Sequence, residues 1–228
     1  MSGSFGVAGR QGLSGSERGR PVPPLLFPFS ERPLPAALLA ELAEAAQAEG
    51  ARLHLPYQRA TDRGLRSTWE AESRNRSDSG RAAESRRWAD GPRSSPGFGL
   101  GPAAGPQDAL DRLPMRDFGA HRRPSALPAL PCETHPALVL LRTAHDRRAD
   151  WLRAGQALER VLLVATAGGV RASLLHQALE WTDLRGDLDR VPDGDYRGHT
   201  QMVIRLGYGP EGPVSPRRGA AEVIDLGG

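Results

Sequence analysis

The longest hydrophobic pattern in the chain covers residues 146–167, where apolar side chains recur at spacings of three and four. This period is typical of a helix, and the second half is apolar nearly all round, which predicts burial on every side. Asp146 is a favourable N-cap, Asp150 adds negative charge in the first turn, and two glycines follow the last turn. We also expect a close neighbour at Gly155, because a glycine inside a helix otherwise costs about 1 kcal/mol.

Shorter patterns on both sides of this helix predict the rest of the ordered fold. Residues 136–143 form a continuous apolar run, which is typical of a strand buried on both faces. Residues 51–55 alternate with a period of two, so Leu53 and Leu55 should share one side of a strand. The full prediction is a helix over residues 35–50, one or two exposed helices over 61–90, and strands over 51–55, 136–143, 172–175 and 201–206.

Two segments lack such patterns. Residues 1–20 are rich in Gly and Ser and too poor in apolar side chains to offset the entropy of ordering, so we expect a disordered leader. Residues 91–131 contain repeated Gly and Pro and are expected to form a long loop or a lid. Residues 21–228, with that loop inside them, are expected to form one domain.

Composition and charge narrow the classes of function. The chain has 228 residues, and its 30 basic residues, all of them Arg, face 27 acidic ones, for a net charge of +3. The two signs are interspersed, which favours a solvated surface over a nucleic-acid interface. The sequence has no run of ~18 apolar residues and no hydrophobic signal core, so we expect a cytoplasmic protein without a membrane partner.

Few residues carry a chemical signal of their own. Cys132 is the single cysteine, which excludes an internal disulfide, and its proline-rich setting favours an inert thiol. The six histidines lack metal-ligand spacing, so no metal is expected, although His176 follows a predicted strand, where ligand contacts are common. Arg217 and Arg218 form a candidate anion site on a proline-stiffened segment, with an exposed basic pair as the alternative. The catalytic residues stay unknown at this stage.

Several motifs resemble the C-terminal part of the nitroreductase family, specifically its Acg-like branch in actinobacteria. The motifs are ADWLRAGQALERVLLVATAGGVRASLLHQALE and, further along, GHTQMVIRLGYGPEGPVSPRRGAAEVID. The earlier stretch FPFSERPLPAALLAELAEAAQAEGARLHL is similar to the opening of that branch's second half. The resemblance therefore extends from about Phe27 to the end of the sequence.

The resemblance implies an α+β nitroreductase-like fold, in which helices flank a mixed sheet and a long central helix lies buried at a subunit or half-to-half interface. Family members bind FMN, take hydride from NAD(P)H and pass it to a quinone or nitroaromatic acceptor, so the flavin supplies the redox chemistry. By motif, Arg217 and Arg218 match the residues that hold the FMN phosphate. Leu175, His176 and Gln177 match the loop that lies against the isoalloxazine.

Two parts of the family pattern are missing. The arginine pair that usually precedes the segment matching Phe27 is replaced by PVPPLL, and no APSxxNxQPW-type motif is present. The chain therefore resembles the second half of a two-half protein, and we expect an incomplete fold that forms a homodimer or pairs with a related nitroreductase-like chain. The alternative function is that of a truncated, flavin-free remnant acting as a binding or flavin-sequestering protein.

Overall fold

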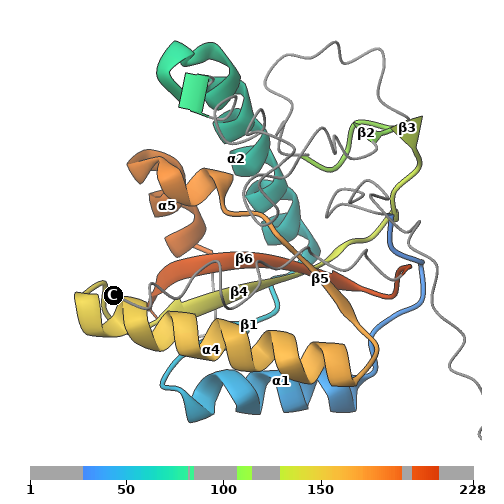
Figure 1. Ribbon diagram of the computed structural model, residues 1–228, viewed down its shortest axis with the longest axis vertical. Helices are drawn as coiled ribbons and strands as arrows, with labels where there is room; N and C mark the ends of the chain where they lie inside the picture. The colour runs from blue at the N-terminus through green and yellow to red at the C-terminus, as the bar shows by residue number, and fades with distance from the viewer. Residues whose placement is uncertain (1–27, 82, 85–106, 115–128, 192–196, 211–228) are drawn as a thin grey trace, which may run out of the picture.

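The structure is a computed structural model, and it describes residues 28–81, 83–84, 107–114, 129–191 and 197–210. Its middle layer is a four-stranded sheet in the order β1 (Arg52–His54), β4 (Ala137–Thr143), β6 (His199–Gly207) and β5 (Arg171–Leu174). One face of the sheet is covered by α1 (Ala36–Ala48) and α4 (Arg148–Ala167), and the other by α2 (Gln58–Ser77) and α5 (Thr182–Asp189) (Figure 1).

The predicted strands are present, and the four-stranded sheet is antiparallel throughout rather than mixed. Residues 138–143 of β4 are all buried, as the apolar run predicts. Parallel pairing in the described residues joins two short strands, β2 (Gln107–Asp108) and β3 (Ala129–Leu130), inside the segment predicted to be a loop. The predicted alternation is wrong at Leu55, which lies beyond the end of β1 and is 42% exposed. Helices that cover an antiparallel sheet confirm the predicted α+β class.

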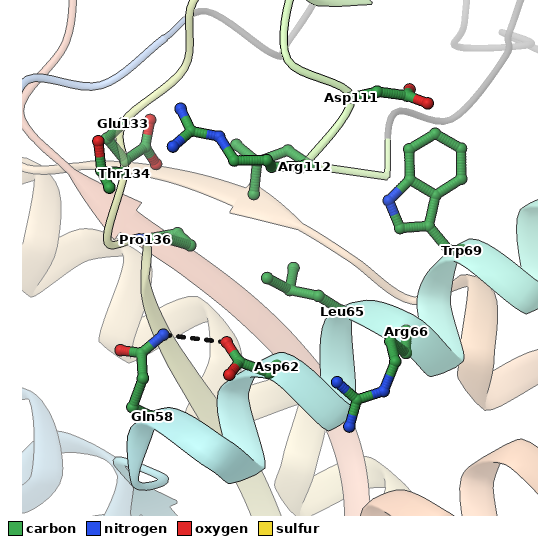
Figure 2. Close-up of a pocket in the computed structure, with 11 residues that line it drawn as sticks. Gln58, Asp62, Leu65, Arg66, Trp69, Asp111, Arg112, Glu133, Thr134 and Pro136 are labelled. Atoms are coloured by element: carbon green, nitrogen blue, oxygen red, sulfur yellow. Dashed lines mark hydrogen bonds between the residues drawn. The ribbon is translucent and has the colours of Figure 1, made fainter.

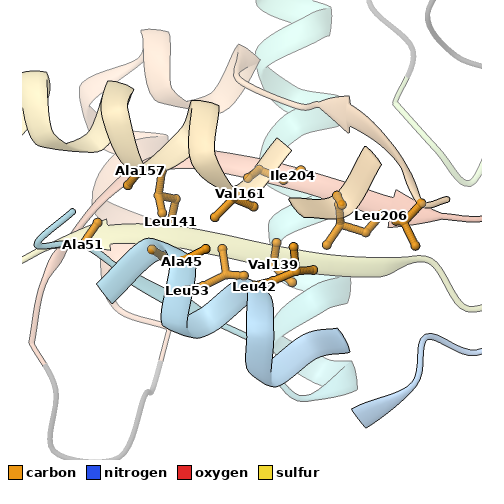
Figure 3. Close-up of a cluster of buried hydrophobic side chains, with 13 residues drawn as sticks. Leu42, Ala45, Ala51, Leu53, Val139, Leu141, Ala157, Val161, Ile204 and Leu206 are labelled. Atoms are coloured by element: carbon orange, nitrogen blue, oxygen red, sulfur yellow. The ribbon is translucent and has the colours of Figure 1, made fainter. Parts of the chain in front are cut away.

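The core beneath α1 and α4 is a continuous apolar cluster. Leu42 of α1, Val161 of α4 and Ile204 of β6 are each 0% exposed. Figure 3 shows that side chains from both helices point at β4 and β6. Ala157 and Ala165 face the same cluster, and their small side chains let α4 lie close to α1.

The start of α4 is set by the side chain of Asp150, the third residue of the helix. Its N-cap is Arg147 and not Asp146, because Asp150 accepts a hydrogen bond from the Arg147 backbone N–H at 3.2 Å. The negative charge predicted for the first turn is confirmed at Asp150. Gly168 is the C-cap, and Gly169 follows with a φ of 71°, a conformation that favours glycine, so the predicted end is also confirmed.

The outer face of α4 is exposed and carries three large apolar side chains among polar and charged ones. Trp151, Leu152 and Leu163 are 50%, 68% and 64% exposed. A Cβ at Gly155 would meet no described atom within 4 Å. The predictions of burial on every side and of a close neighbour at Gly155 are therefore wrong for the single chain, because α4 packs on the core with one stripe of residues and its other side is exposed.

Helix α2 is less exposed than the sequence predicts. Its inner face packs against α5 and the short 3-10 turn η2 (Gln177–Glu180). The residues on this face are small or polar, so they produce no hydrophobic period, and Thr68 satisfies its buried hydroxyl by donating to the Gly64 carbonyl at 2.8 Å. The buried residues of α2 are Ala60, Thr61, Gly64, Ser67, Thr68, Ala71 and Glu72.

Candidate functional site

A pocket of about 330 Å³ lies between α2 and the chain around β2 and β3 (Figure 2). Ligand pockets commonly span roughly 300–1,000 Å³, so this pocket is at the lower end of the range. Its size therefore suits a small ligand better than a large cofactor.

One wall of the pocket is a single face of α2. Its lining residues recur at spacings of three and four, with one adjacent pair, as expected for one stripe of a helix. This stripe differs from the buried one, so α2 packs on the core with one side and lines the pocket with another. Gln58 Nε2 donates to Asp62 Oδ1 at 3.0 Å. The lining residues from α2 are Gln58, Asp62, Leu65, Arg66 and Trp69.

The opposite wall is ordered by the buried carboxylate of Asp108. Its Oδ1 accepts the backbone N–H groups of Leu110 and Cys132 at 3.1 and 3.2 Å. Its Oδ2 accepts those of Arg112 and Leu113 at 2.8 and 3.0 Å. Burial acts to raise the pKa of Asp108, but these hydrogen bonds outweigh it and lower the pKa. The charged carboxylate thus holds the turn that brings Arg112 and Leu113 to the pocket.

Two guanidinium groups and one indole border the pocket. Arg112 Nη2 donates to the Cys132 carbonyl at 2.8 Å, whereas its buried Nε has no hydrogen-bond partner among the described residues. Arg66 is exposed and makes no hydrogen bond or ion pair with the described part of the chain. Trp69 is half-buried beside them. The pocket therefore combines an aromatic surface with cationic donors that are not consumed by the fold.

One lining residue of the pocket, Glu133, belongs to a buried ion pair. Glu133 is 5% exposed and receives two hydrogen bonds of 2.5 Å from Arg205, which is 1% exposed. The Phe29 backbone N–H donates to Glu133 Oε2 at 3.0 Å, and the Arg205 guanidinium lies 4.1 Å from the centre of the Phe29 ring. The charge of Glu133 is therefore compensated inside the protein, although this residue lines the pocket.

The predicted flavin loop lies between β5 and η2, away from the pocket lining. Leu175 is 2% exposed and Gln177 1%, so both side chains face the core beneath α2. His176 reaches the surface with a side chain that is 37% exposed, and its Nε2 lies 3.5 Å from Glu180 Oε1. Of the three residues predicted to contact the isoalloxazine, His176 thus has the accessible side chain.

The second predicted site lies outside the described residues. Arg217 and Arg218, assigned to the FMN phosphate, belong to the range 211–228, so their role stays a prediction.

Cys132 is described and buried. Burial raises the pKa of its thiol to about 11, which keeps the sulfur protonated near neutral pH. The burial of the thiol agrees with the expectation that it is inert, which stays a prediction.

Sequence reasoning missed the pocket. It assigned Trp69 to a largely exposed helix, although the recurrence of polar and aromatic residues along one face of α2 was a usable signal. Asp108 gave no such signal, because its hydrogen bonds depend on a contact with Cys132 across 24 residues.

Neither a membrane span nor a metal centre is found in the described residues. No helix among them is long and apolar enough to cross a membrane. The same residues hold no group of three or more His, Cys, Asp or Glu side chains placed to bind a metal ion.

Comparison with known proteins connects the chain to nitroreductases. No protein-family model matches it. It is 32% identical over 124 residues to "Putative NAD(P)H nitroreductase Rv3131" of Mycobacterium tuberculosis strain H37Rv and, equally, to "Putative NAD(P)H nitroreductase MT3217" of strain CDC 1551. The aligned part is 53% of this chain, but it spans 36% of the length of either relative.

A solved structure gives the fold. The nitroreductase of Desulfitobacterium hafniense DCB-2 with bound FMN superposes with a TM-score of 0.52, covering 90% of this chain and 93% of that one at 10% identity. An identity this low shows the fold alone. The protein therefore has a nitroreductase-like α+β fold, as the resemblance of its motifs implies.

The described residues fit FMN in part. His176 offers an accessible side chain, and the buried Gln177 Oε1 is an acceptor without a hydrogen-bond partner among the described residues. The three residues that the resemblance assigns to the isoalloxazine lie at the β5–η2 turn, and none of them lines the pocket beside α2.

Proposed function

We propose that the protein is an FMN-dependent oxidoreductase of the nitroreductase type, which passes hydride from NAD(P)H through flavin to a quinone or nitroaromatic acceptor. The observation that carries the proposal is the 32% identity over 124 residues to proteins named as NAD(P)H nitroreductases. The nitroreductase-like fold supports it. A cytoplasmic location, where NAD(P)H is available, goes with this function.

Within this proposal, FMN supplies the redox chemistry when it is bound, and the chain supplies position. His176 would lie against the isoalloxazine from the turn after β5, while Leu175 and Gln177 would hold that turn from the core. Arg217 and Arg218 would grip the phosphate with charge-assisted hydrogen bonds.

Self-association through α4 completes the proposal. Trp151, Leu152 and Leu163 are large apolar side chains exposed on the outer side of α4, among charged and polar ones, and exposed apolar side chains grouped on one element can mark an interaction site. A homodimer, or a pair with a related nitroreductase-like chain, would cover them. Light scattering coupled to size-exclusion chromatography tests this point, and a monodisperse monomer that also fails to bind a related chain would contradict it.

A flavin-free binding or flavin-sequestering protein is the second candidate. The burial of Leu175 and Gln177 favours its flavin-free form, because these side chains cannot reach a flavin without movement of the turn. The two candidates differ in chemistry, since a sequestering protein would hold FMN without turning over NAD(P)H.

Purification followed by an absorbance spectrum and anaerobic addition of NADH or NADPH separates the candidates. The oxidoreductase should carry a yellow chromophore that is bleached by one of the two nucleotides and restored by a quinone. A preparation that stays colourless after incubation with FMN would contradict the oxidoreductase, and a yellow one that no nucleotide bleaches would favour sequestration.

The double variant Arg217→Ala/Arg218→Ala tests the assignment of the phosphate site. It should weaken FMN binding by about 2–4 kcal/mol, because two charge-assisted hydrogen-bond donors are lost. Unchanged FMN affinity in equilibrium dialysis would remove the two arginines from the site.

A further inference from the structure

The pocket beside α2 is not explained by the proposed flavin chemistry. Leu175, His176 and Gln177 are absent from its lining. The pocket nevertheless has a defined shape, because a buried carboxylate orders one wall and a regular helix forms the other. We propose that it binds a monoanionic aromatic acid with a single ring.

The apolar part of the pocket fits the ring. Leu65 and Trp69 contribute from α2, and Leu113 and Pro136 from the opposite wall. In Figure 2 the Leu65 and Pro136 side chains lie below that of Arg112, whose guanidinium extends toward Glu133. A planar ring placed there gains dispersion contacts from the aliphatic side chains and an aromatic contact from the indole. The volume of about 330 Å³ limits the ligand to a small one.

The cationic part of the pocket fits the carboxylate. A guanidinium has five N–H donors, and the Nη2 group of Arg112 donates to the Cys132 carbonyl at 2.8 Å. The Nη1 group of Arg112 has no acceptor in the described part of the chain, whereas the Nε is fully buried and out of reach of a ligand. A ligand carboxylate would accept hydrogen bonds from the two Nη groups. Arg66, also without a described partner, adds a positive charge from the α2 wall, opposite the wall that carries Arg112.

The acidic residues of the pocket limit the charge of the ligand. Arg205 compensates Glu133, and Asp62 is partnered by the neutral Gln58 amide. Asp62 and Asp111 therefore keep negative charge near the two guanidiniums. With Glu133 compensated by Arg205, the two guanidiniums and the carboxylates of Asp62 and Asp111 leave the lining without net charge, so a dianion such as a phosphate monoester would add twice the uncompensated charge of a monoanion. The chemistry thus points to a carboxylic acid and away from a phosphorylated ligand.

Isothermal titration calorimetry of the full chain with benzoate tests the proposal without any flavin. Benzoate should bind at millimolar or lower concentration. Benzamide, which has the same shape without the charge, should bind about tenfold or more weakly, because a charge-assisted hydrogen bond is lost. Phenyl phosphate should bind more weakly than benzoate. No detectable binding of benzoate, or equal binding of benzamide, would overturn the proposal, and neither result depends on whether FMN binds.

Variants locate the binding site. Arg112→Met removes all the donors of that side chain and should abolish measurable benzoate binding, with circular dichroism as the check that the chain is folded. Trp69→Leu and Arg66→Gln leave the turn around Asp108 in place and should each weaken binding about threefold or more. Arg63→Gln is the matched control, because Arg63 is an exposed arginine of α2 outside the pocket lining, and it should bind as the unaltered protein does. Unchanged binding by both Trp69→Leu and Arg66→Gln would overturn the assignment even if Arg112→Met failed to fold.

Discussion

The two faces of the sheet are built from different chemistry. Alternate residues of β4 and β6 point to opposite sides, so Val139 and Ile204 join the apolar cluster under α1 and α4. Leu138 and Val203 join a separate apolar cluster under α2 and α5. On that second side the strands also place the buried arginines Arg142 and Arg205, whose hydrogen bonds hold neighbouring segments.

The contrast separates stability from recognition. An apolar face is stabilised by burial alone and tolerates little polar chemistry. The polar face needs a partner for every buried charge, but the same arrangement provides donors and carboxylates beside a pocket. We therefore expect changes under α1 and α4 to affect stability, and changes beside α2 to affect binding as well.

The largest expected effect comes from the ion pair on the polar face. Arg205→Met should lower the free energy of unfolding by about 3–5 kcal/mol, because Glu133 would remain buried with an uncompensated charge. Urea denaturation followed by circular dichroism measures this loss.

A double variant isolates the cause of that loss. Glu133→Leu/Arg205→Met should recover most of the lost stability, since replacing both members of a buried pair by apolar residues is often close to neutral. If the double variant were as unstable as Arg205→Met, the loss would come from the contact between Arg205 and Phe29 or from packing, and the ion pair would not be the cause.

The next largest effect belongs to the apolar face. Leu42→Ala should cost about 2–5 kcal/mol in unfolding free energy, because the side chain is 0% exposed and leaves a cavity. Leu163→Ala, on the exposed side of α4, is the matched control and should change stability by less than about 0.5 kcal/mol in dilute solution. A larger loss that grows with protein concentration would show that this side is covered in solution, as the proposed self-association requires.

The smallest effect concerns Asp146, which connects the two faces. It accepts hydrogen bonds from Trp151 at 2.6 Å, Arg185 at 2.8 Å and Gln201 at 3.2 Å. Burial acts to raise the pKa of Asp146, but the hydrogen bonds from Trp151, Gln201 and Arg185 lower it to about 2. A lowered pKa in the folded state stabilises the protein above the unfolded-state pKa of about 4, and this stabilisation is lost as the pH falls towards 2.

Asp146→Asn measures that contribution. At neutral pH the variant should be less stable by about 1 kcal/mol, a value reduced for the partial exposure of the carboxylate. The difference from the unaltered protein should shrink between about pH 4 and about pH 2. A difference in urea midpoint that is the same at both ends of this range would rule out the charge of Asp146 as its cause.

The apolar face was the more predictable from sequence. Apolar residues recur with a helical period in α1 and α4 and form a continuous run in β4, and these elements lie close to where the patterns place them. The polar face was less predictable, because the inner side of α2 is formed by residues such as Gly64 and Thr68, which carry no hydrophobic signal. The exposure of Leu163 was also missed, since hydrophobicity alone does not distinguish a core from an interface.

The candidate sites show the same limit. The position of His176 after a strand was predicted from the strand expected over residues 172–175, which the structure places at Arg171–Leu174. The burial of Leu175 and Gln177 depends on how α2 packs over that turn, which is a tertiary contact without a local pattern. The pocket likewise requires α2 and the turn around Asp108 to meet across the chain.

Flavin binding is the central claim, and a titration of FMN fluorescence with the purified full chain tests it most directly. The account predicts saturable quenching that is weakened by Arg217→Ala/Arg218→Ala and unaffected by benzoate, because the aromatic acid occupies a different pocket. Fluorescence that stays constant as the protein is added, with the chain folded by circular dichroism, would contradict it.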